Sequence, residues 1–342
     1  MSWLWVFTML CMGASTLTTS GRFDYVVSIP DIHGDLEILL RALWIANSEI
    51  SADVSTFQEF IATVGAELKS KKSKKSSARV LLINTGDIVD RGPQSLSCYK
   101  AIEAGASVLG WTLVNLIGNH EVMTIGGQAD HYAHPNDIEE FGGIEGRHAQ
   151  FGPGGILWKK ITDDFMFLAK VEIGLNDATL FVHAGIDPLG WMKSMAGQGL
   201  SSVESINNFL LNELKKNPYS EFISGANSPV WTRDLALKED KIVCDQLLPE
   251  IFEFFKINRI VVGHTPQESL RTKQRCGSKL LLADVAMSRW MGSGQFGNPS
   301  AIVFTLGNDG NDLKRIHNVY WNGTEKVHQE IDDKLEEENY EL

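Results

Sequence analysis

The chain has 342 residues, of which 43% are hydrophobic, with 31 glycines and 10 prolines. This is the composition of an ordinary globular protein, long enough for one large core or for a core with an inserted subdomain. The formal net charge of -12 argues against a general nucleic-acid-binding protein, although it does not describe the local field at a binding site.

The first twenty residues differ from the rest of the chain. Residues 3–12 are almost all apolar, and those that follow up to Ser20 are small or hydroxylated. This pattern predicts a signal peptide over residues 1–20, with an uncleaved anchor or a buried N-terminal segment as alternatives. The apolar run is too short to span a bilayer, so no stable membrane insertion is expected after its removal. We therefore expect the secretory pathway, with the protein in the ER lumen or secreted.

Short apolar runs predict the strands of an α/β fold, and amphipathic segments between some of them predict helices. The strand-like runs are rich in Val, Ile and Leu and are bounded by Gly, Asp or Pro. They cover residues 25–29, 80–83, 113–117, 179–182, 260–262, 279–285 and 301–306. Apolar residues at helical spacing predict helices over residues 36–47, 57–68, 203–214 and 247–255.

Three segments lack such a pattern. The basic, Ser-containing run at residues 69–75 is typical of a solvated loop. The Gly-rich stretch at residues 123–177 is long for a connection in a compact domain, which predicts an inserted lid or binding loop that selects the substrate. Residues 325–342 carry many Asp and Glu and predict a solvated, frayed acidic tail. A single domain is therefore expected over residues 22–324.

Cysteines and one sequon give weaker information. Outside the first twenty residues the cysteines are Cys98, Cys244 and Cys276. Three cysteines do not make a disulfide framework and their spacing fits no zinc motif, so buried or free thiols are the default expectation. At most one bridge could form, and the sequence leaves open whether it does. The sequon Asn-Gly-Thr at residues 322–324 is a weak sign of passage through the secretory pathway.

Polar residues stand directly after five of the strand-like runs. The motifs are DIHGD, GDIVDRG, GNHE, HAG and GHTP, in this order along the chain. Ligand sites in such sheets form outside the carboxyl ends of the strands, so the five motifs are expected to meet at one site. The candidate metal ligands in them are Asp31, His33, Asp87, Asn119, His183 and His264.

These side chains fit a centre with two metal ions that hydrolyses phosphoesters. Two ions about 3.5–4 Å apart can hold a hydroxide that attacks phosphorus directly, and they neutralise the phosphate oxygens. Oxygen and imidazole donors without thiolate favour Mn, Fe or Zn as the divalent or trivalent ions, and three histidines argue against Mg or Ca. Asp87 is the candidate bridging ligand. The other site would be completed by Asn119, His183 and His264.

Asp31 and His33 would complete the first metal site. They are separated by one residue, so on an extended strand end their side chains are expected to point to the same side. Gly34 would then let the chain turn tightly beside the ions.

The residues beside the ligands predict the rest of the catalytic machinery. His120 is the candidate general acid, because an alkoxide leaving group needs a proton. Asp90 is expected to orient the His120 imidazole and to raise its pKa by charge pairing. Arg91 can bind two oxygens of the phosphate, and Asn119 is expected to contact the substrate as well.

The five motifs, in this order and spacing, resemble those of the phosphoprotein phosphatases of the calcineurin-like metallophosphoesterase superfamily. They cover the chain from Asp31 to Pro266. The resemblance implies a β-sandwich flanked by helices, with a dinuclear metal site at the C-terminal ends of strands. It also implies the roles given above, a phosphoprotein or phosphopeptide substrate, and a second phosphate-binding residue, Arg233, which taken alone resembles a surface arginine.

Departures from the usual phosphatase pattern point to one branch. Pro30 replaces the Gly before the first Asp, Ile117 stands in place of Arg before GNHE, and Ala184 stands in place of the Gly after the histidine of HAG. The SAPNYCG signature is absent, and residues 282–288 read LADVAMS. With PVWTR at residues 229–233, the chain is most similar to the bacterial-like Shewanella-like protein phosphatases, which implies insensitivity to okadaic acid and microcystin.

Two other functions stay open at this stage. A symmetrical dinucleoside-polyphosphate hydrolase shares this metal site, and Trp158 or Trp231 could hold a base, although core packing is the commoner role. A catalytically silent binding module is the second, but all the predicted ligands are present. Asp284 could line the mouth of the site or be a structural residue. The sequence does not decide the preferred phosphorylated residue or the oligomeric state.

Overall fold

The computed structural model describes residues 16–18, 23–51, 55–70, 78–173, 177–291, 297–307 and 312–331. Most of the predicted signal peptide, most of the basic run at 69–75 and the end of the acidic tail lie outside the described residues. No helix in the described part of the chain is long and apolar enough to cross a membrane.

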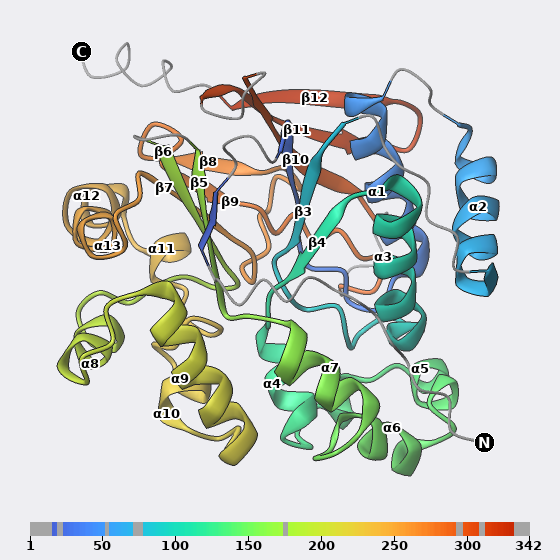
Figure 1. Ribbon diagram of the computed structural model, residues 1–342, viewed down its shortest axis with the longest axis horizontal. Helices are drawn as coiled ribbons and strands as arrows, with labels where there is room; N and C mark the ends of the chain where they lie inside the picture. The colour runs from blue at the N-terminus through green and yellow to red at the C-terminus, as the bar shows by residue number, and fades with distance from the viewer. Residues whose placement is uncertain are drawn as a thin grey trace.

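The described strands form two six-stranded sheets (Figure 1). Sheet A has the order β1-β5-β6-β7-β9-β8, and sheet B has the order β12-β11-β10-β2-β3-β4. The strands of sheet A are β1 (Thr16–Thr18), β5 (Leu168–Ile173), β6 (Asp177–Val182), β7 (Arg259–Val262), β8 (Lys273–Arg275) and β9 (Leu280–Leu282). Those of sheet B are β2 (Tyr25–Ile29), β3 (Val80–Asn84), β4 (Thr112–Asn115), β10 (Ser300–Leu306), β11 (Leu313–Trp321) and β12 (Lys326–Ile331).

The two sheets pack face to face. Successive side chains of a strand point to opposite faces, so Val26 lies in the cluster between the sheets while Val27 lies in the cluster that packs against the helices. Phe181 of sheet A and Phe304 of sheet B meet across the interface, with ring centroids 5.8 Å apart. The structure therefore confirms the predicted fold class, an α/β sandwich of the calcineurin-like phosphoesterase type.

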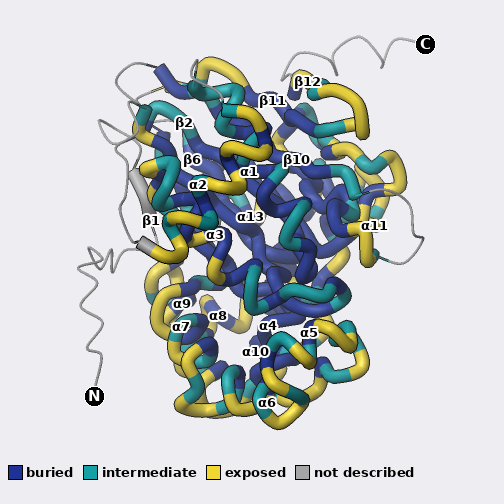
Figure 2. The backbone as a smooth tube through the Cα atoms, turned by 90° about the vertical axis from the view of Figure 1, so that its right-hand side faces the viewer, coloured by how far each residue is buried: buried dark blue, intermediate teal, exposed yellow. Residues whose placement is uncertain are grey.

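Helices flank the sandwich, and their exposed faces stand out in Figure 2 against the buried strands. Those beside sheet B are α1 (Leu36–Ile50), α2 (Phe57–Ser70) and α3 (Ser95–Leu109). Those beside sheet A are α8 (Trp191–Gly197), α9 (Val203–Lys216), α10 (Glu221–Ser224), α11 (Asp234–Leu237), α12 (Asp240–Ile242), the π-helical segment η2 (Val243–Leu247) and α13 (Leu248–Phe255).

The Gly-rich segment is largely helical, so it is not an irregular loop; its role as a lid or in substrate selection stays a prediction. Several of its glycines end or begin short helices: Gly143 and Gly152 cap one of them, and Gly155 caps the next. Phe151 and Ile161 anchor these helices in the core. The helices lie below the sheets in Figure 1: α4 (Asn119–Ile125), η1 (Asp130–Tyr132), α5 (Pro135–Glu140), α6 (Ile144–Phe151) and α7 (Ile156–Asp164).

The expectation of a frayed acidic tail is wrong for its first residues. β12 pairs antiparallel with β11, with Lys326 opposite Trp321 and Ile331 opposite Ile316. Ile331 is buried between the sheets, which explains why these residues stay ordered despite their polar composition. At the other end of the chain, β1 pairs parallel with β5 within the segment predicted as a signal peptide.

Cys244 and Cys276 form a disulfide, so the default expectation of free thiols is wrong for this pair. The bond joins η2 to the turn between β8 and β9, across a sequence separation of 32 residues. Cys98 is a buried free thiol. The strand pairing that brings Cys276 back beside the helices is a long-range contact, which cysteine spacing alone does not reveal.

Candidate metal centre

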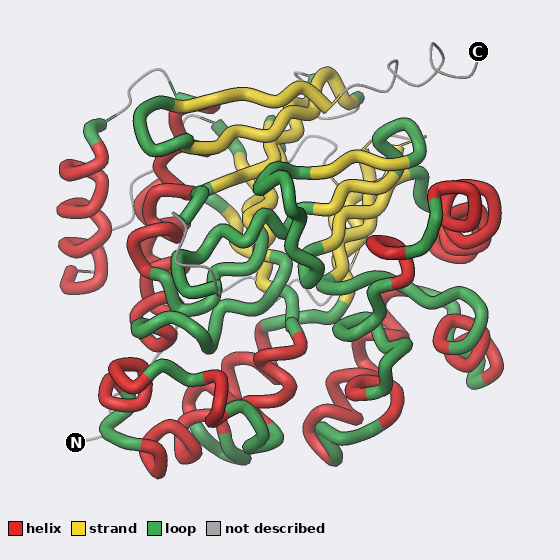
Figure 3. The backbone as a smooth tube through the Cα atoms, turned by 180° about the vertical axis from the view of Figure 1, so that it is seen from behind, coloured by secondary structure: helices red, strands yellow, loops and turns green. Residues whose placement is uncertain are grey.

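Six parallel strands deliver the candidate residues to one edge of the sandwich. In sheet B, β2, β3 and β4 run parallel. In sheet A, β6, β7 and β9 do the same. The loops after their carboxyl ends gather in the region between the sheets and the lower helices, seen from behind in Figure 3. The predicted convergence of the motifs therefore follows directly from the topology.

Asp87 lies at the centre of the site. Its Oδ2 is 3.6 Å from His33 Nε2 and 3.5 Å from His183 Nε2, and it belongs to two separate groups of potential ligand atoms. Its Oδ1 accepts a hydrogen bond of 2.9 Å from the backbone N–H of His120. A Cβ on Gly118 would lie only 2.1 Å from that oxygen, so glycine is required there. This is the position expected of a carboxylate shared by two ions.

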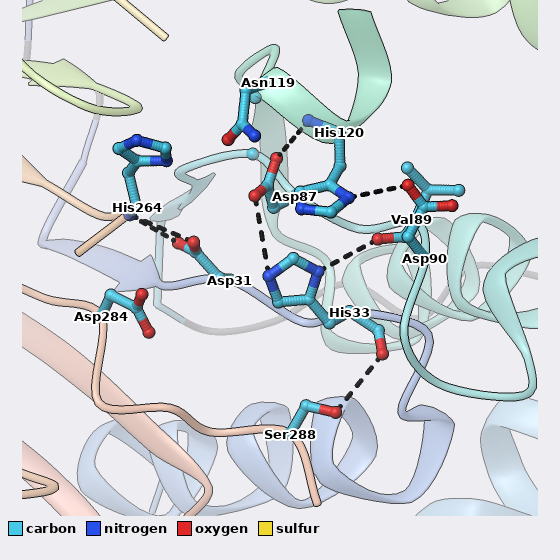
Figure 4. A network of polar contacts seen from close by, with 12 residues as sticks. Asp31, His33, Asp87, Val89, Asp90, Asn119, His120, His264, Asp284 and Ser288 are labelled. Carbon is cyan, nitrogen blue, oxygen red and sulfur yellow. Dashed lines mark hydrogen bonds and ion pairs between the residues drawn. The ribbon is translucent and has the colours of Figure 1, made fainter. Parts of the chain in front are cut away.

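The first group of ligand atoms comes from His33, Asp87 and His120, all buried. His33 Nδ1 lies 3.1 Å from the carbonyl oxygen of Val89, so Nδ1 carries the proton and the lone pair of Nε2 is available to a metal ion beside Asp87 (Figure 4). His33 has a φ of 46° and Gly34 a φ of 62°. The expectation of an extended strand end is therefore wrong, because the chain already turns in the left-handed region at His33.

The second group comes from Asp87, His183 and His264. His183 Nδ1 lies 2.8 Å from the Thr85 carbonyl, which leaves the lone pair of Nε2 available to a metal ion; Nε2 is 2.9 Å from Asn119 Oδ1. His264 Nε2 lies 3.2 Å from the backbone carbonyl of Trp231, which leaves Nδ1 as the nitrogen that can bind a metal ion. Fixing one ring nitrogen on a carbonyl is the usual way in which proteins prepare the other for a metal.

Asp31 lies outside both groups but beside them. Its carboxylate accepts the backbone N–H of His264 at 3.1 Å, and Figure 4 shows it lying between His264 and His33. A Cβ on Gly263 would come within 2.3 Å of Asp31 Oδ1. The site thus contains all six predicted ligands.

Asp284 is a buried carboxylate that sequence reasoning left undecided. It follows β9, which is parallel to β7, so its loop reaches the same edge as the loop of His264. Asp284 Oδ2 has no hydrogen-bond partner among the described residues, and its charge raises the pKa of Asp31. The strand-like run at 279–285 was the signal that could have placed Asp284 in the site.

The electrostatics of the site fit bound cations. Burial and the Asp284 carboxylate raise the pKa of Asp31 well above its ordinary value, and burial and the nearby Glu121 do the same for Asp87. Burial raises the pKa of Asp284 to about 6 and lowers that of His183 to about 3. Clustered buried carboxylates beside neutral imidazoles are the donor set of a transition-metal centre.

His120 and Asp90 lie together beside this donor set. His120 Nδ1 is 2.7 Å from Asp90 Oδ2, which leaves Nε2 free for a proton or a ligand. The predicted effect of Asp90 on the His120 pKa stays a prediction. Burial, with the charges of Arg91 and Arg147, lowers the pKa of His120 to about 3, and burial raises that of Asp90 to about 7.

Arg147 was missed by sequence reasoning. It is 1% exposed, and its guanidinium pairs with Asp90 and lies 3.5 Å from both Asp130 and Asp137. It comes from α6, inside the segment whose glycines suggested a loop. A lone arginine in a polar segment gives no sequence signal of burial, so only the packing of α6 against the Asp90 loop reveals its position.

The two predicted phosphate-binding arginines flank the ligands. Arg91 has a φ of 63°, its guanidinium lies 5.3 Å from the ring centroid of Tyr132, and its Nε has no hydrogen-bond partner among the described residues. Arg233 is exposed and donates from Nη1 to the His264 carbonyl at 2.9 Å and to Thr265 Oγ1 at 3.0 Å. Both are placed where an anion at the metal centre would be within reach.

Glu121 holds the ligand loops together. Its buried carboxylate accepts the backbone N–H groups of Asp87, Ile88 and Gly118 at 2.8–2.9 Å, and the Tyr99 hydroxyl at 3.0 Å. The last residue of the GNHE motif therefore joins the loops after β3 and β4.

A third group of potential ligands lies away from this centre. Glu49 of α1 accepts from His317 at 3.0 Å and from His328 at 2.9 Å, and its other oxygen is 2.6 Å from Lys326 Nζ. Because an ammonium group already neutralises this carboxylate, we assign the group to an ion-pair network that fastens α1 to the β11–β12 hairpin.

The sequence is similar to those of known phosphoesterases, as the geometry of the site suggests. The calcineurin-like phosphoesterase family matches residues 25–268, more than half of the chain. Shewanella-like protein phosphatase 2 of Arabidopsis thaliana is 24% identical over 318 residues, which cover 79% of this chain and 73% of that protein. Shewanella-like protein phosphatase 1 of Plasmodium berghei (strain Anka) is 23% identical over 279 residues, with coverage of 79% and 69%.

The fold is also found among solved structures. The crystal structure of a cold-active protein-tyrosine phosphatase of a psychrophilic Shewanella species superposes with a TM-score of 0.61. It is 20% identical, and the match covers 93% of this chain and 82% of that one. The chain therefore belongs to the calcineurin-like phosphoesterase family and is a metal-dependent phosphoester hydrolase.

Proposed function

We propose that this protein is a phosphoprotein phosphatase that hydrolyses phosphomonoesters at a two-metal centre. The observation that carries the proposal is the Asp90–His120 pair, 2.7 Å apart, beside ligand groups that share Asp87. A phosphomonoester of serine or threonine leaves as an alkoxide, which needs a proton donor. The relatives named protein phosphatases support the same class of substrate.

The ligand roles in this proposal are those that the motifs predict, and the two groups of ligand atoms that share Asp87 support them. Asp87 would be shared by both ions. Asp31 and His33 would complete one site, and the Asn119 amide with two imidazoles would complete the other. When bound, the ions would neutralise phosphate oxygens and lower the pKa of a water that attacks phosphorus. The remaining ligands are Asn119, His183 and His264.

The protein's own groups carry the other steps. Arg91, whose Nε has no hydrogen-bond partner among the described residues, binds oxygens of the phosphate, and Arg233 approaches them from its position beside the His264 carbonyl. Asn119 is close enough to the centre to contact the phosphate as well as a metal. The Asp90–His120 pair supplies the proton for the leaving oxygen through His120 Nε2, while Nδ1 stays bonded to Asp90.

Insensitivity to okadaic acid and microcystin is part of the proposal. The segment at residues 282–288 follows β9, and Ser288 Oγ donates to the carbonyl of His33 at 3.3 Å, so this sequence forms the wall of the site. A different wall removes the surface that these toxins recognise. Full activity of the pure enzyme in nanomolar toxin supports this part, and inhibition at that level contradicts it.

We also propose that the protein enters the secretory pathway. The apolar segment at residues 3–12 motivates this, and the Cys244–Cys276 disulfide supports it, because disulfides persist in oxidising compartments. A fusion of residues 1–22 to a reporter should be carried into the ER lumen. A reporter that stays in the cytosol would refute this compartment.

Substrate class is tested with a panel of paired phosphoserine, phosphothreonine and phosphotyrosine peptides and diadenosine tetraphosphate, with Mn present. Asp87→Asn is the inactive control, and Asp245→Asn, at an exposed position on η2, is the matched surface control. Phosphopeptide turnover that only Asp87→Asn abolishes supports the proposal. Cleavage of diadenosine tetraphosphate alone would instead assign the site to the dinucleoside-polyphosphate hydrolases, with Trp231, 5.9 Å from the His264 ring, as a candidate base platform.

A further inference from the structure

The β11–β12 hairpin carries a motif that the hydrolase site does not use. Its turn, residues 322–325, is Asn-Gly-Thr-Glu, and all four residues are exposed. The full sequence contains no other Asn-x-Ser/Thr triplet with x other than proline, since Asn298 is followed by Pro299. We propose that Asn322 is the single site of N-linked glycosylation of this protein, an inference that rests on the proposed secretory targeting.

The turn presents the Asn322 side chain outward in a fixed orientation. Its Oδ1 accepts from the backbone N–H of Thr324 at 3.0 Å, from Thr324 Oγ1 at 3.1 Å and from the N–H of Glu325 at 2.9 Å. The amide oxygen is thereby satisfied within the turn, which leaves Nδ2 facing solvent. Gly323 has a φ of 99°, so the middle position of the sequon is one that glycine fills without strain.

A glycan at this position would disturb neither the core nor the catalytic site. The strands below the turn are anchored by Trp321, which packs against Trp44 of α1 with ring centroids 5.7 Å apart. In Figure 1 the β11–β12 hairpin lies at the top of the molecule, whereas α4, which carries Asn119 and His120, lies below the sheets. The sugar would therefore project into solvent away from the substrate.

The second, independent observation is the Cys244–Cys276 disulfide. A chain that folds in the cytosol keeps its thiols reduced, whereas a chain that acquires this bond passes through an oxidising compartment. In eukaryotic cells that compartment also contains the lipid-linked sugar donor. An exposed sequon and a disulfide on different elements thus point to the same route.

The chemistry is a glycosyl transfer from a lipid-linked oligosaccharide diphosphate. A bond forms between Asn322 Nδ2 and the anomeric carbon of the first sugar. The bond from that carbon to the diphosphate oxygen breaks, and the lipid diphosphate leaves with the electron pair. The amide nitrogen loses one proton, and no atom is oxidised or reduced.

The test expresses the full chain, residues 1–342, in cultured eukaryotic cells and treats it with a peptide N-glycosidase. We expect one discrete shift in mobility and conversion of Asn322 to aspartate, detected by mass spectrometry. Asn322→Gln and Thr324→Val should abolish the shift, whereas Thr324→Ser keeps the sequon and should retain it. Turnover of phosphopeptide should be equal for the glycosylated protein and Thr324→Val, because the turn is remote from the catalytic site.

Each failure has a different meaning. Protein recovered from the lumen or the medium with its disulfide intact but no glycan overturns the glycosylation and leaves the compartment standing. Cytosolic protein without glycan overturns both. Phosphopeptide hydrolysis is measured on the same preparations, so loss of the proposed phosphatase activity is recognised independently of either result.

Discussion

Three imidazoles of the site show how single residues are prepared for their roles. In each, one ring nitrogen lies within hydrogen-bond distance of a backbone carbonyl, which leaves the other nitrogen to face the carboxylates. His120 differs, because its Nδ1 is bonded to a carboxylate, that of Asp90. This contrast separates the proposed proton donor from the proposed ligands His33, His183 and His264.

Replacement of His120 tests its role as an acid. His120→Asn should lower turnover of a phosphoserine peptide by about a hundredfold or more, since the alkoxide must leave without a proton. Turnover of p-nitrophenyl phosphate should fall much less, because p-nitrophenolate leaves readily unprotonated. Steady-state kinetics on the two substrates give the ratio. An equal loss on both would mean that His120 acts as a ligand or a structural residue.

Arg147 is a positioning residue for this pair. Arg147→Lys keeps a buried positive charge but loses the planar guanidinium that reaches Asp90, Asp130 and Asp137. We expect kcat for a phosphoserine peptide to fall with little change in KM, and the pH dependence of kcat to shift. Arg147→Met, which leaves buried carboxylates unpaired, should instead cost about 3–5 kcal/mol of stability. If Arg147→Lys leaves the pH dependence of kcat unchanged, Arg147 has only a structural role.

At the residue scale, the motifs after the strands predicted most residues of the site, whereas residues outside these motifs could not be placed from the sequence. The candidate ligands Asp31, Asp87 and His264 were found in the sequence because each follows a strand-like run that the structure buries. Arg147 and Asp284 were missed or left open, because a buried charge in a polar segment has no sequence signature. Their positions depend on tertiary packing of α6 and of the loop after β9.

At the scale of elements, buried strands are predicted best. β2, β3 and β10 were identified within a residue or two, because runs of Val, Ile and Leu buried on both faces carry a strong signal. β8 and β12 were missed because most of their residues are polar and only the last residue of each strand, Arg275 and Ile331, is buried. The short helices α5 to α7 were missed because glycines separate them.

An ion pair at the start of two neighbouring strands should respond to pH. Asp24 accepts from the backbone N–H of Arg79 at 2.8 Å and from the Arg79 Nε at 3.1 Å. The Arg79 side chain lowers the pKa of Asp24. A carboxylate with a lowered pKa stabilises the fold fully above its unfolded value, about 3.9, and loses this contribution as the pH falls through the folded value.

Asp24→Asn should therefore lower the free energy of unfolding at neutral pH. Because both side chains are partly exposed, the loss should be about 0.2–1 kcal/mol. Urea unfolding of the two proteins should show this difference at about pH 7 and a smaller one below about pH 3. A difference that grows on acidification would contradict the assignment.

At the scale of the whole molecule, loops from two sheets meet at one edge of the sandwich, and a disulfide joins η2 to the turn between β8 and β9. Cys244 and Cys276 close a loop whose ends are 32 residues apart. Loop-closure entropy for this length corresponds to about 3–4 kcal/mol of stabilisation. The fold class and the position of the site were predictable from the order of motifs, whereas this cross-link required the pairing of β7, β8 and β9.

Removal of the disulfide should lower global stability without changing the metal site. The double variant Cys244→Ser, Cys276→Ser should lose about 3 kcal/mol of unfolding free energy. Cys98→Ser, at a thiol outside the bond, separates this effect from general thiol loss. Equal stability of the oxidised wild type and the double variant would show that the bond does not constrain the unfolded chain.

The central claim is that one carboxylate, Asp87, is shared by two metal ions that perform the hydrolysis. The most direct measurement is bound metal per chain, by mass spectrometry, together with phosphopeptide turnover, for the wild type and Asp87→Asn after chelation and reconstitution with Mn. The account predicts that chelation abolishes wild-type turnover, that Mn restores it, and that Asp87→Asn loses both bound metal and at least about a hundredfold in turnover. Full turnover by the chelated wild type, or by Asp87→Asn without bound metal, would contradict it.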